Sequence, residues 1–287
     1  RPGLEDDRWC GGLLAAGVRE QHHPREDRFA NMGTSTGRAL DGHVTDAVGF
    51  ECGMNEATLR DTVLQAISAY DYPSVTYDFA QQREVSLPAM QDLDDYIHSL
   101  LHSSDPRSVK HGLSGILYWG HYRRTGVRDH RVERFRTMVT DDELKKSITT
   151  FRTLDGTGLI KLEKLRLPEF RYMAFVSKLR TFLDPEHYCV LDSKIASLAP
   201  LAARLTLQST YIPITAHNER AYAWWVNACQ SMASRLCARP PTRPVDVERG
   251  LFYLVDHGQR DLAERCLKTL ASNAVRSDVE CRSELSE

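Results

Sequence analysis

The sequence predicts an all-α protein, because its apolar residues recur at helical spacing and signals for helix starts are frequent. Asn55 is a predicted N-cap, and after it Leu59, Val63, Ile67 and Tyr70 follow at intervals of three or four residues. No segment combines period-two alternation with a hairpin turn, so we expect no β-hairpin. The 287 residues are enough for one large domain or two small ones.

The first half of the chain contains several further helix signals. We interpret residues 71–87 as an irregular or weakly extended loop. Pro88 then begins a predicted helix to about residue 103, and Pro106 begins another that ends near Gly126. Thr140 and Glu143 have the spacing of a capping box at the start of the next helix.

The second half alternates short helices with stops. Pro168 separates a predicted short helix over 159–167 from a helix that runs through Phe182, and Asp184-Pro185 ends that helix. A short extended piece then leads to Asp192, the predicted N-cap of a helix over 193–205. Three more helices are expected near 217–238, near 246–257 and from about 261. We therefore expect residues 1–54 to be a flexible N-terminal arm, 55–271 a helical domain and 272–287 a frayed tail.

Composition excludes several classes of protein. Hydrophobic residues make up 41% and charged residues 26% of the chain, which is unlike a disordered, collagen-like or disulfide-scaffold sequence. No apolar run is long enough to cross a bilayer and no secretory signal is visible, so we expect no contact with a membrane. The seven cysteines are odd in number and lack Cys-X2-Cys spacing, which predicts free thiols in a reducing cytoplasm. We expect no metal site, no cofactor and a monomer.

The charges are distributed unevenly along the chain. Residues 51–105 contain ten acidic and two basic residues, whereas 107–136 contain eight basic and two acidic residues. Residues 161–180 contain six basic and two acidic residues. An acidic region beside basic regions suits a protein that binds a polyanion through one face, so these segments favour a nucleic acid as partner.

The stretch from 167 to 199 is the most informative part of the sequence. It contains a break at Pro168, a helix with Lys178, a stop, a short apolar segment and then Asp192. Lys178 and Asp192 are fourteen residues apart. Because the Asp184-Pro185 stop lets the chain turn back, we expect both side chains to face one cleft.

This arrangement resembles the helix–hairpin–helix DNA glycosylase superfamily, in particular its 8-oxoguanine DNA glycosylase-like branch. Leu167-Pro168 is similar to the start of the family hairpin, Lys178 to its nucleophile, and Val190-Leu191-Asp192 to the segment that bears the catalytic aspartate. The resemblance implies two helical lobes with a cleft between them and DNA as the partner. The family hairpin usually carries Gly-X-Gly, and this chain has no glycine there, so we expect a helical DNA-glycosylase-like fold with a remodelled helix–hairpin–helix.

The chemistry of base excision explains this choice of residue types. Breaking an N-glycosidic bond develops positive charge on the sugar, which a carboxylate such as Asp192 stabilises. The free amides of a helix N-terminus favour the ionised form of an aspartate there. Lys178 can attack the sugar only as a neutral amine, and it would then form a Schiff base that permits strand cleavage. If Lys178 lies outside the pocket, Asp192 and a water molecule remain sufficient for a monofunctional enzyme.

The segment from Tyr118 to Tyr122 supplies the predicted base pocket. An enzyme that acts on a base must flip it out of the stack and hold it between aromatic side chains. Tyr118, His121 and Tyr122 have helical spacing, so we expect them to share a face on which a flipped base stacks. Glu248, in a predicted core helix near the C-terminus, is interpreted as structural.

Four residues are predicted to contact the DNA backbone. Arg123 and Arg124 suit phosphate contacts, with a solvated face as the equal alternative. Ser193 and Lys194 follow the aspartate in the first turn of its helix, where backbone amides can meet a phosphate.

Together these features favour a DNA N-glycosylase, with or without lyase activity on the abasic product. Its substrate would be a damaged or modified base, in DNA repair or in defence against phage with modified DNA. Two alternatives remain open on the sequence. One is a non-catalytic helical DNA-binding module, and the other is a helical interaction protein that binds no nucleic acid.

Overall fold

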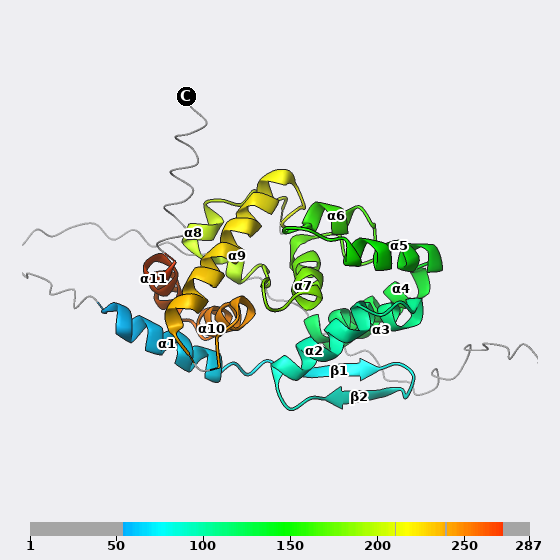
Figure 1. Ribbon diagram of the computed structural model, residues 1–287, viewed down its shortest axis with the longest axis horizontal. Helices are drawn as coiled ribbons and strands as arrows, with labels where there is room; N and C mark the ends of the chain where they lie inside the picture. Colours follow the sequence, from blue (N-terminus) through cyan, green and yellow to red (C-terminus); the bar gives the residue numbers. More distant parts are fainter. Residues whose placement is uncertain (1–53, 210, 239, 272–287) are drawn as a thin grey trace, which may run out of the picture. The chain divides into compact units, whose positions relative to one another are not determined.

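Helices make up most of the described chain, which confirms the predicted all-α class (Figure 1). The computed structural model describes residues 54–209, 211–238 and 240–271. The predicted tail over 272–287, and the predicted arm apart from residue 54, lie outside the described residues. In chain order the helices are α1 (Glu56–Ser68), α2 (Met90–Leu101), α3 (Pro106–Gly120), α4 (Thr125–Met138), α5 (Asp141–Arg152), α6 (Leu159–Glu163), α7 (Met173–Leu183), the 3-10 helix η1 (Ile195–Ser197), α8 (Ala199–Ala202), α9 (Ala216–Leu236), α10 (Pro244–Asp256) and α11 (Arg260–Leu270).

The segment that we expected to be an irregular loop contains a β-hairpin. Strands β1 (Val75–Asp78) and β2 (Arg83–Ser86) pair antiparallel. The turn between them has none of the Asn-Gly or Asp-Gly pairs that mark a hairpin in a sequence. The Asp78 carboxylate instead accepts hydrogen bonds from the backbone N–H groups of Ala80 and Gln81 and so closes the turn. The expectation of no hairpin was therefore wrong.

Two predicted helices differ from those in the structure. The helix predicted to reach Gly126 ends at Gly120, and α4 follows after a short connection. Only Val132 and Phe135 of α4 are buried, so this helix lacks the apolar spacing that revealed the others. The helix predicted over 193–205 is broken into η1 and α8, because Leu198 is extended between them.

The helices pack in two groups, and α7 packs against α2, α3 and α6. Helix α10 packs against α1, α9 and α11, whereas α3 packs against α2, α4, α5 and α7 (Figure 1). Gly250 allows α1 and α10 to approach closely, because a Cβ atom at this position would lie 2.8 Å from the Ile67 side chain and 3.3 Å from its backbone nitrogen. From Val176 to Leu183 every residue of α7 is buried, so α7 lies at the centre of the core.

A buried ion-pair network joins α2 to α10. Asp94 has no exposed surface, and its carboxylate accepts hydrogen bonds from Arg249 at 2.6 and 2.9 Å. Arg243, the N-cap residue of α10, donates to the same carboxylate at 2.9 Å. Asp246 pairs with both arginines, at 2.8 and 3.4 Å. Two-point contacts of this kind are the strong form of an arginine–carboxylate pair, so they determine how α10 is oriented on α2.

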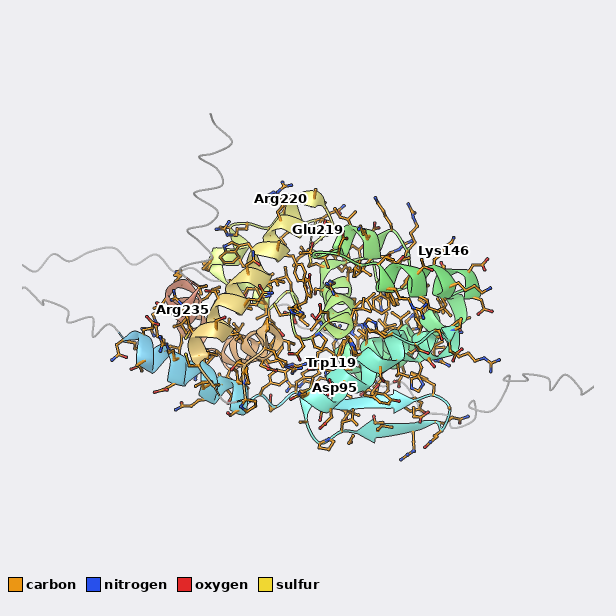
Figure 2. All side chains as sticks on the ribbon, in the orientation of Figure 1. Asp95, Trp119, Lys146, Glu219, Arg220 and Arg235 are labelled. Carbon is orange, nitrogen blue, oxygen red and sulfur yellow. The ribbon has the colours of Figure 1, made fainter. Side chains whose placement is uncertain are left out.

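Asp94→Asn is expected to lower the free energy of unfolding by about 3–5 kcal/mol, because it leaves buried arginine charge uncompensated. Urea unfolding at neutral pH measures this change. Asp95 is the exposed neighbour on the same helix and provides the control (Figure 2). The free energy of unfolding of Asp95→Asn should stay within about 0.5 kcal/mol of that of the parent. Equal stability of the two variants would show that the network does not hold α2 to α10.

Candidate functional site

The extended segment before Asp192 is buried, and side chains of α9 hold its backbone. The Tyr222 hydroxyl donates to the carbonyl of Cys189 at 2.9 Å, and the Trp225 indole donates to the carbonyl of Val190 at 2.9 Å. A buried segment outside regular structure needs such partners for its polar backbone groups. The two aromatic residues of α9 therefore fix the position of this segment and of Asp192 at its end.

Helix α7 holds the same segment through one serine. The Ser177 hydroxyl accepts a hydrogen bond from the N–H of Leu191 at 3.0 Å, and it lies 3.2 Å from the carbonyl of the same residue. Lys178 follows Ser177 in the chain, and Asp192 follows Leu191. The contact between Ser177 and Leu191 thus brings the lysine and the aspartate to one place.

Lys178 and Asp192 both line a pocket of about 310 Å³, which is within the usual range for small-molecule sites. The pocket lies where α7, α10, the end of α3, the segment 70–72 and the turn before η1 meet. Its walls are largely aromatic, and they comprise Tyr70, Tyr72, Trp119, Phe175 and Phe252 together with His121. The remaining lining residues are Gly120, Arg123, Arg124, Ala174, Val190, Ser193, Lys194 and Glu248.

The Lys178 side chain is 8% exposed and lies against an aromatic ring. Its Nζ is 3.4 Å from the carbonyl oxygen of Ala174 and 5.4 Å from the centre of the Phe175 ring. Gly120 allows α3 to approach this point, because a Cβ atom there would lie 2.8 Å from Phe175 and 3.3 Å from the Lys178 stem. The amine is therefore placed in a mainly apolar wall of the pocket.

Asp192 was predicted to be the N-cap of a helix, but it closes the turn that leads into the short η1, whose N-cap residue is Lys194. The Oδ1 of Asp192 accepts hydrogen bonds from the N–H groups of Lys194 at 3.0 Å and Ile195 at 3.1 Å. Within the described residues its second oxygen, Oδ2, takes part in no hydrogen bond. That oxygen is available to a ligand in the pocket.

His121 is the one residue of the predicted base pocket that lines this site. Its ring lies 4.6 Å from that of Phe175, centre to centre. Burial, and after it the positive charges of Lys178, Arg131 and Arg124, lower the pKa of His121 from 6.5 to about 4. His121 is therefore neutral at physiological pH.

Tyr118 and Tyr122 lie elsewhere, so the prediction that they form the base pocket is corrected. The Tyr118 hydroxyl donates to the Glu84 carboxylate on β2. The Arg128 guanidinium covers both tyrosine rings, at 4.2 and 5.6 Å from their centres. The reason is that α3 ends at Gly120, so His121 no longer follows the helical spacing that we assumed for all three residues.

The four predicted backbone contacts are at the pocket, but two of them are paired with acids. Arg123 forms ion pairs with Asp71 at 3.1 Å and with Asp256 at 3.0 Å. Lys194 also pairs with Asp256, and its backbone N–H is used by Asp192. Arg124 and Ser193 are exposed. In the part of the chain that the structure describes, Arg124 forms no ion pair, so its charge is available to a phosphate group. At Arg123 and Lys194 a phosphate group would compete with Asp256.

Glu248 is a pocket residue that the sequence analysis interpreted as structural. Its side chain on α10 is buried, with 4% of the residue exposed. Burial, and after it the charge of Asp192, raise the pKa of Glu248 from 4.5 to about 8. The available signal was that Glu248 and Arg249 lie between the apolar residues Val247 and Leu251, because two charged residues in a core stretch need an explanation.

The hairpin between α6 and α7 keeps a left-handed turn without glycine. Glu169 has a φ of 69° and Arg166 a φ of 54°, both in the region that glycine normally occupies. The Glu169 carboxylate is nearly buried and forms ion pairs with Arg131 and Arg134 of α4. We infer that these pairs offset the strain of the turn.

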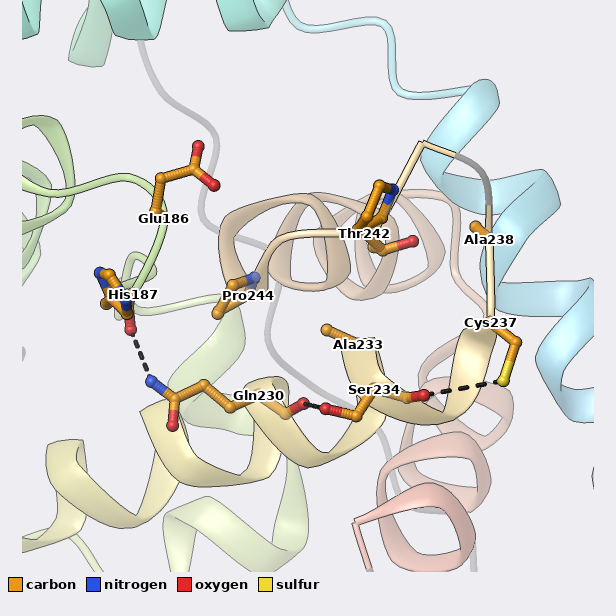
Figure 3. Close-up of a pocket in the computed structure, with 10 residues that line it drawn as sticks. Glu186, His187, Gln230, Ala233, Ser234, Cys237, Ala238, Thr242 and Pro244 are labelled. Atoms are coloured by element: carbon orange, nitrogen blue, oxygen red, sulfur yellow. Dashed lines mark hydrogen bonds between the residues drawn. The ribbon is translucent and has the colours of Figure 1, made fainter.

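A second pocket of about 330 Å³ lies between α9 and the segment that precedes α10 (Figure 3). Glu186 and His187 line it together with Gln230 and Ser234 of α9, and the Gln230 amide donates to the carbonyl of His187 at 2.9 Å (Figure 3). The side chains of Glu186 and His187 are 62% and 68% exposed. Exposed side chains of this kind do not form a preorganised site, so we place the candidate site in the pocket of Lys178 and Asp192.

Comparison of the chain with known protein families, with curated proteins and with solved structures gives no match. The site must therefore be interpreted from its own geometry. Within the described part of the chain, no three residues among His, Cys, Asp and Glu come together as metal ligands would. No helix in those ranges has the length and apolar character needed to cross a membrane.

Lys178→Gln is expected to raise the pKa of His121 from about 4 towards 6.5, because the lysine charge is one cause of the low pKa. NMR titration of the histidine ring signals measures this pKa, with His121→Gln to assign the signal. Lys146 is exposed on α5 and provides the matched control, so Lys146→Gln should leave the titration unchanged (Figure 2). An unchanged His121 pKa in Lys178→Gln would contradict the proximity of the two side chains.

Glu248→Gln is expected to become more stable relative to the parent as the pH rises. The parent pKa of about 8 lies above the ordinary 4.5, so the protonated form is favoured in the folded state. Protonated Glu248 therefore contributes to the stability of the parent, fully below about pH 4.5, and this stability is lost as the pH rises towards 8. Between pH 5 and 8 the free energy of unfolding of Glu248→Gln should therefore increase relative to that of the parent by on the order of 3 kcal/mol.

Urea unfolding of both proteins across this pH interval measures the difference. Glu133 is exposed on α4, and Glu133→Gln should differ from the parent by a constant amount. A constant difference for Glu248→Gln as well would show that Glu248 is ionised in the folded protein.

Proposed function

We propose that the protein is a DNA N-glycosylase with a helical DNA-glycosylase-like fold, and that it flips a damaged or modified base into the pocket of Lys178 and Asp192. One observation carries this proposal: the amine and the carboxylate line the same aromatic pocket. Aromatic walls bind a planar base by stacking, and buried polar groups at its edge give specificity. We propose base excision in DNA repair, or in defence against phage with modified DNA, as the biological setting.

The two groups have complementary roles in the proposed reaction. As the bond between the base and C1′ breaks, its electron pair leaves with the base and positive charge develops on the sugar. The free oxygen of Asp192 stabilises this charge. The Lys178 ammonium first passes a proton to solvent, and the resulting neutral amine bonds to C1′. The nitrogen then loses a second proton, the bond between C1′ and the ring oxygen breaks, and the ring oxygen takes up a proton, which gives a Schiff base. Addition of water to C1′ in place of the amine gives the monofunctional reaction.

The proposed DNA contacts start at the mouth of the pocket. Arg124 is exposed beside it, and Arg166 and Arg171 are exposed on the hairpin before α7. Exposed arginines of this kind bind phosphates and position the duplex without reading its sequence. We expect binding to weaken with rising salt concentration, since each phosphate contact releases counterions.

Asp192→Asn is expected to reduce base release at least about 100-fold, because it removes the charge that stabilises the sugar cation. Asparagine can accept the same two backbone hydrogen bonds, so the turn before η1 should persist. The assay uses duplexes that each bear one damaged or modified base, followed by heating in alkali to cleave abasic sites. Asp95→Asn is the control. A fully active Asp192→Asn variant would contradict the assigned site.

Borohydride distinguishes the two forms of the reaction in the same assay. Reduction of a Schiff base leaves the protein covalently attached to DNA, and we expect this adduct in the parent and in Lys146→Gln but not in Lys178→Gln. Absence of the adduct in the parent, with base release retained, would identify the monofunctional enzyme. Salt-dependent binding of DNA without release of any base would instead support the non-catalytic DNA-binding module.

A further inference from the structure

A second carboxyl group lies in the pocket without a partner. Glu248 lines the pocket and is 4% exposed, but its carboxyl takes part in no hydrogen bond or ion pair within the described ranges. The next residue, Arg249, does not compensate it, because both terminal nitrogens of Arg249 bond to carboxylates of the Asp94 network. A buried charge without a partner is strongly unfavourable, so such a carboxyl keeps its proton or meets a ligand.

Charged groups from four parts of the structure act on Glu248, namely the turn before η1, α2, α7 and α10 itself. Asp192 from the turn before η1 raises the pKa of Glu248, and Asp94 of α2 does so more weakly. Arg249 and Lys178 lower this pKa, but burial and Asp192 outweigh them and bring it to about 8. Tyr70, Cys189 and Cys229 also interact with Glu248, and burial raises the pKa of all three, so they are neutral at physiological pH. Glu248 is therefore protonated at neutral pH.

The two carboxyl groups of the pocket have different surroundings. Asp192 accepts two backbone N–H hydrogen bonds, which stabilise a carboxylate. Glu248 receives none and faces the charge of Asp192. Unequal surroundings for two neighbouring carboxyls are the usual arrangement in enzymes that use one as an acid and the other as an anion.

On the basis of the proposed function, we propose that Glu248 is the general acid of this site and protonates the base as it leaves. The bond between C1′ and the base nitrogen breaks, and its electron pair stays on the base. The Glu248 proton passes to a nitrogen or oxygen atom of the base, which leaves neutral, and Glu248 becomes a carboxylate that solvent protonates again. Asp192 stabilises the sugar in the same step.

This assignment also specifies the class of substrate. Protonation assists most when the base is a poor leaving group, that is, when its anion is unstable and it has a basic ring nitrogen or carbonyl oxygen. A base that leaves as a stable anion needs no acid. The pocket should therefore favour bases of the first kind, with their acceptor atom directed towards α10.

Glu248→Gln tests the assignment, because the amide can donate a hydrogen bond but has no proton to transfer. Single-turnover rates of base release are measured for the parent, Glu248→Gln and the control Glu133→Gln from about pH 5 to about pH 10, on the duplex that the parent cleaves best. At neutral pH the parent should exceed Glu248→Gln by at least about 100-fold. Above about pH 8 this ratio should fall about tenfold for each pH unit, because the parent loses its acid.

A second measurement reports on the carboxyl itself without any substrate. NMR of protein labelled with carbon-13 at glutamate carboxyl groups should show one group that titrates near pH 8 and is absent in Glu248→Gln. Its pKa should fall in Asp192→Asn, since the neighbouring charge is gone.

The outcomes separate the two proposals. If the parent releases a base but the ratio of the parent rate to the Glu248→Gln rate is near one, or does not change with pH, the role of Glu248 is overturned. The proposed glycosylase function is then unaffected. A parent that releases no base from any duplex overturns the proposed function, and the role of Glu248 with it. A carboxyl that titrates near its ordinary pH also overturns the role of Glu248.

Discussion

The site depends on how the protein satisfies the backbone of one buried segment that belongs to no helix or strand. Ser177, Tyr222 and Trp225 provide the hydrogen-bond partners of residues 189–191. Since these side chains come from α7 and α9, the segment can lie in only one place relative to both helices. Asp192 directly follows this segment in the chain, and Lys178 directly follows Ser177 on α7. The same set of hydrogen bonds thus stabilises the core and brings the two functional groups together.

The charge of Glu248 in the pocket depends on the ion pairs that Arg249 forms outside it. The Asp94 network uses Arg249 and Arg243 to join α2 to α10, so both terminal nitrogens of Arg249 bond to carboxylates other than that of Glu248. Among the residues that line the pocket, Asp192 raises the pKa of Glu248 and Lys178 lowers it. The core network and the chemistry of the site are therefore coupled, because an arginine used to orient a helix is not available to neutralise an acid.

Sequence reasoning predicted the helices best where apolar residues face a single core. It placed α1, α2, α9, α10 and α11 within a few residues of their observed bounds. It missed α4, of which only Val132 and Phe135 are buried, and the β-hairpin, whose turn depends on Asp78 rather than on glycine. The placement of Tyr118 and Tyr122 in the pocket was wrong, because one helix was assumed to continue where α3 ends. The position of Glu248 in this pocket could not be predicted, because most of the other lining residues are distant from it in the sequence.

The residue order alone determined that this chain forms helices, which of their faces are apolar, and that an amine and a carboxylate stand on either side of a helix stop. These properties are local, since they depend on spacing and capping within a few residues. Only the tertiary structure decided that Glu248 shares a pocket with Lys178 and Asp192 whereas Tyr118 and Tyr122 do not, and that Asp256 compensates Arg123 and Lys194. The physical reason is that burial and charge compensation depend on distances between side chains of separate helices, and packing sets those distances.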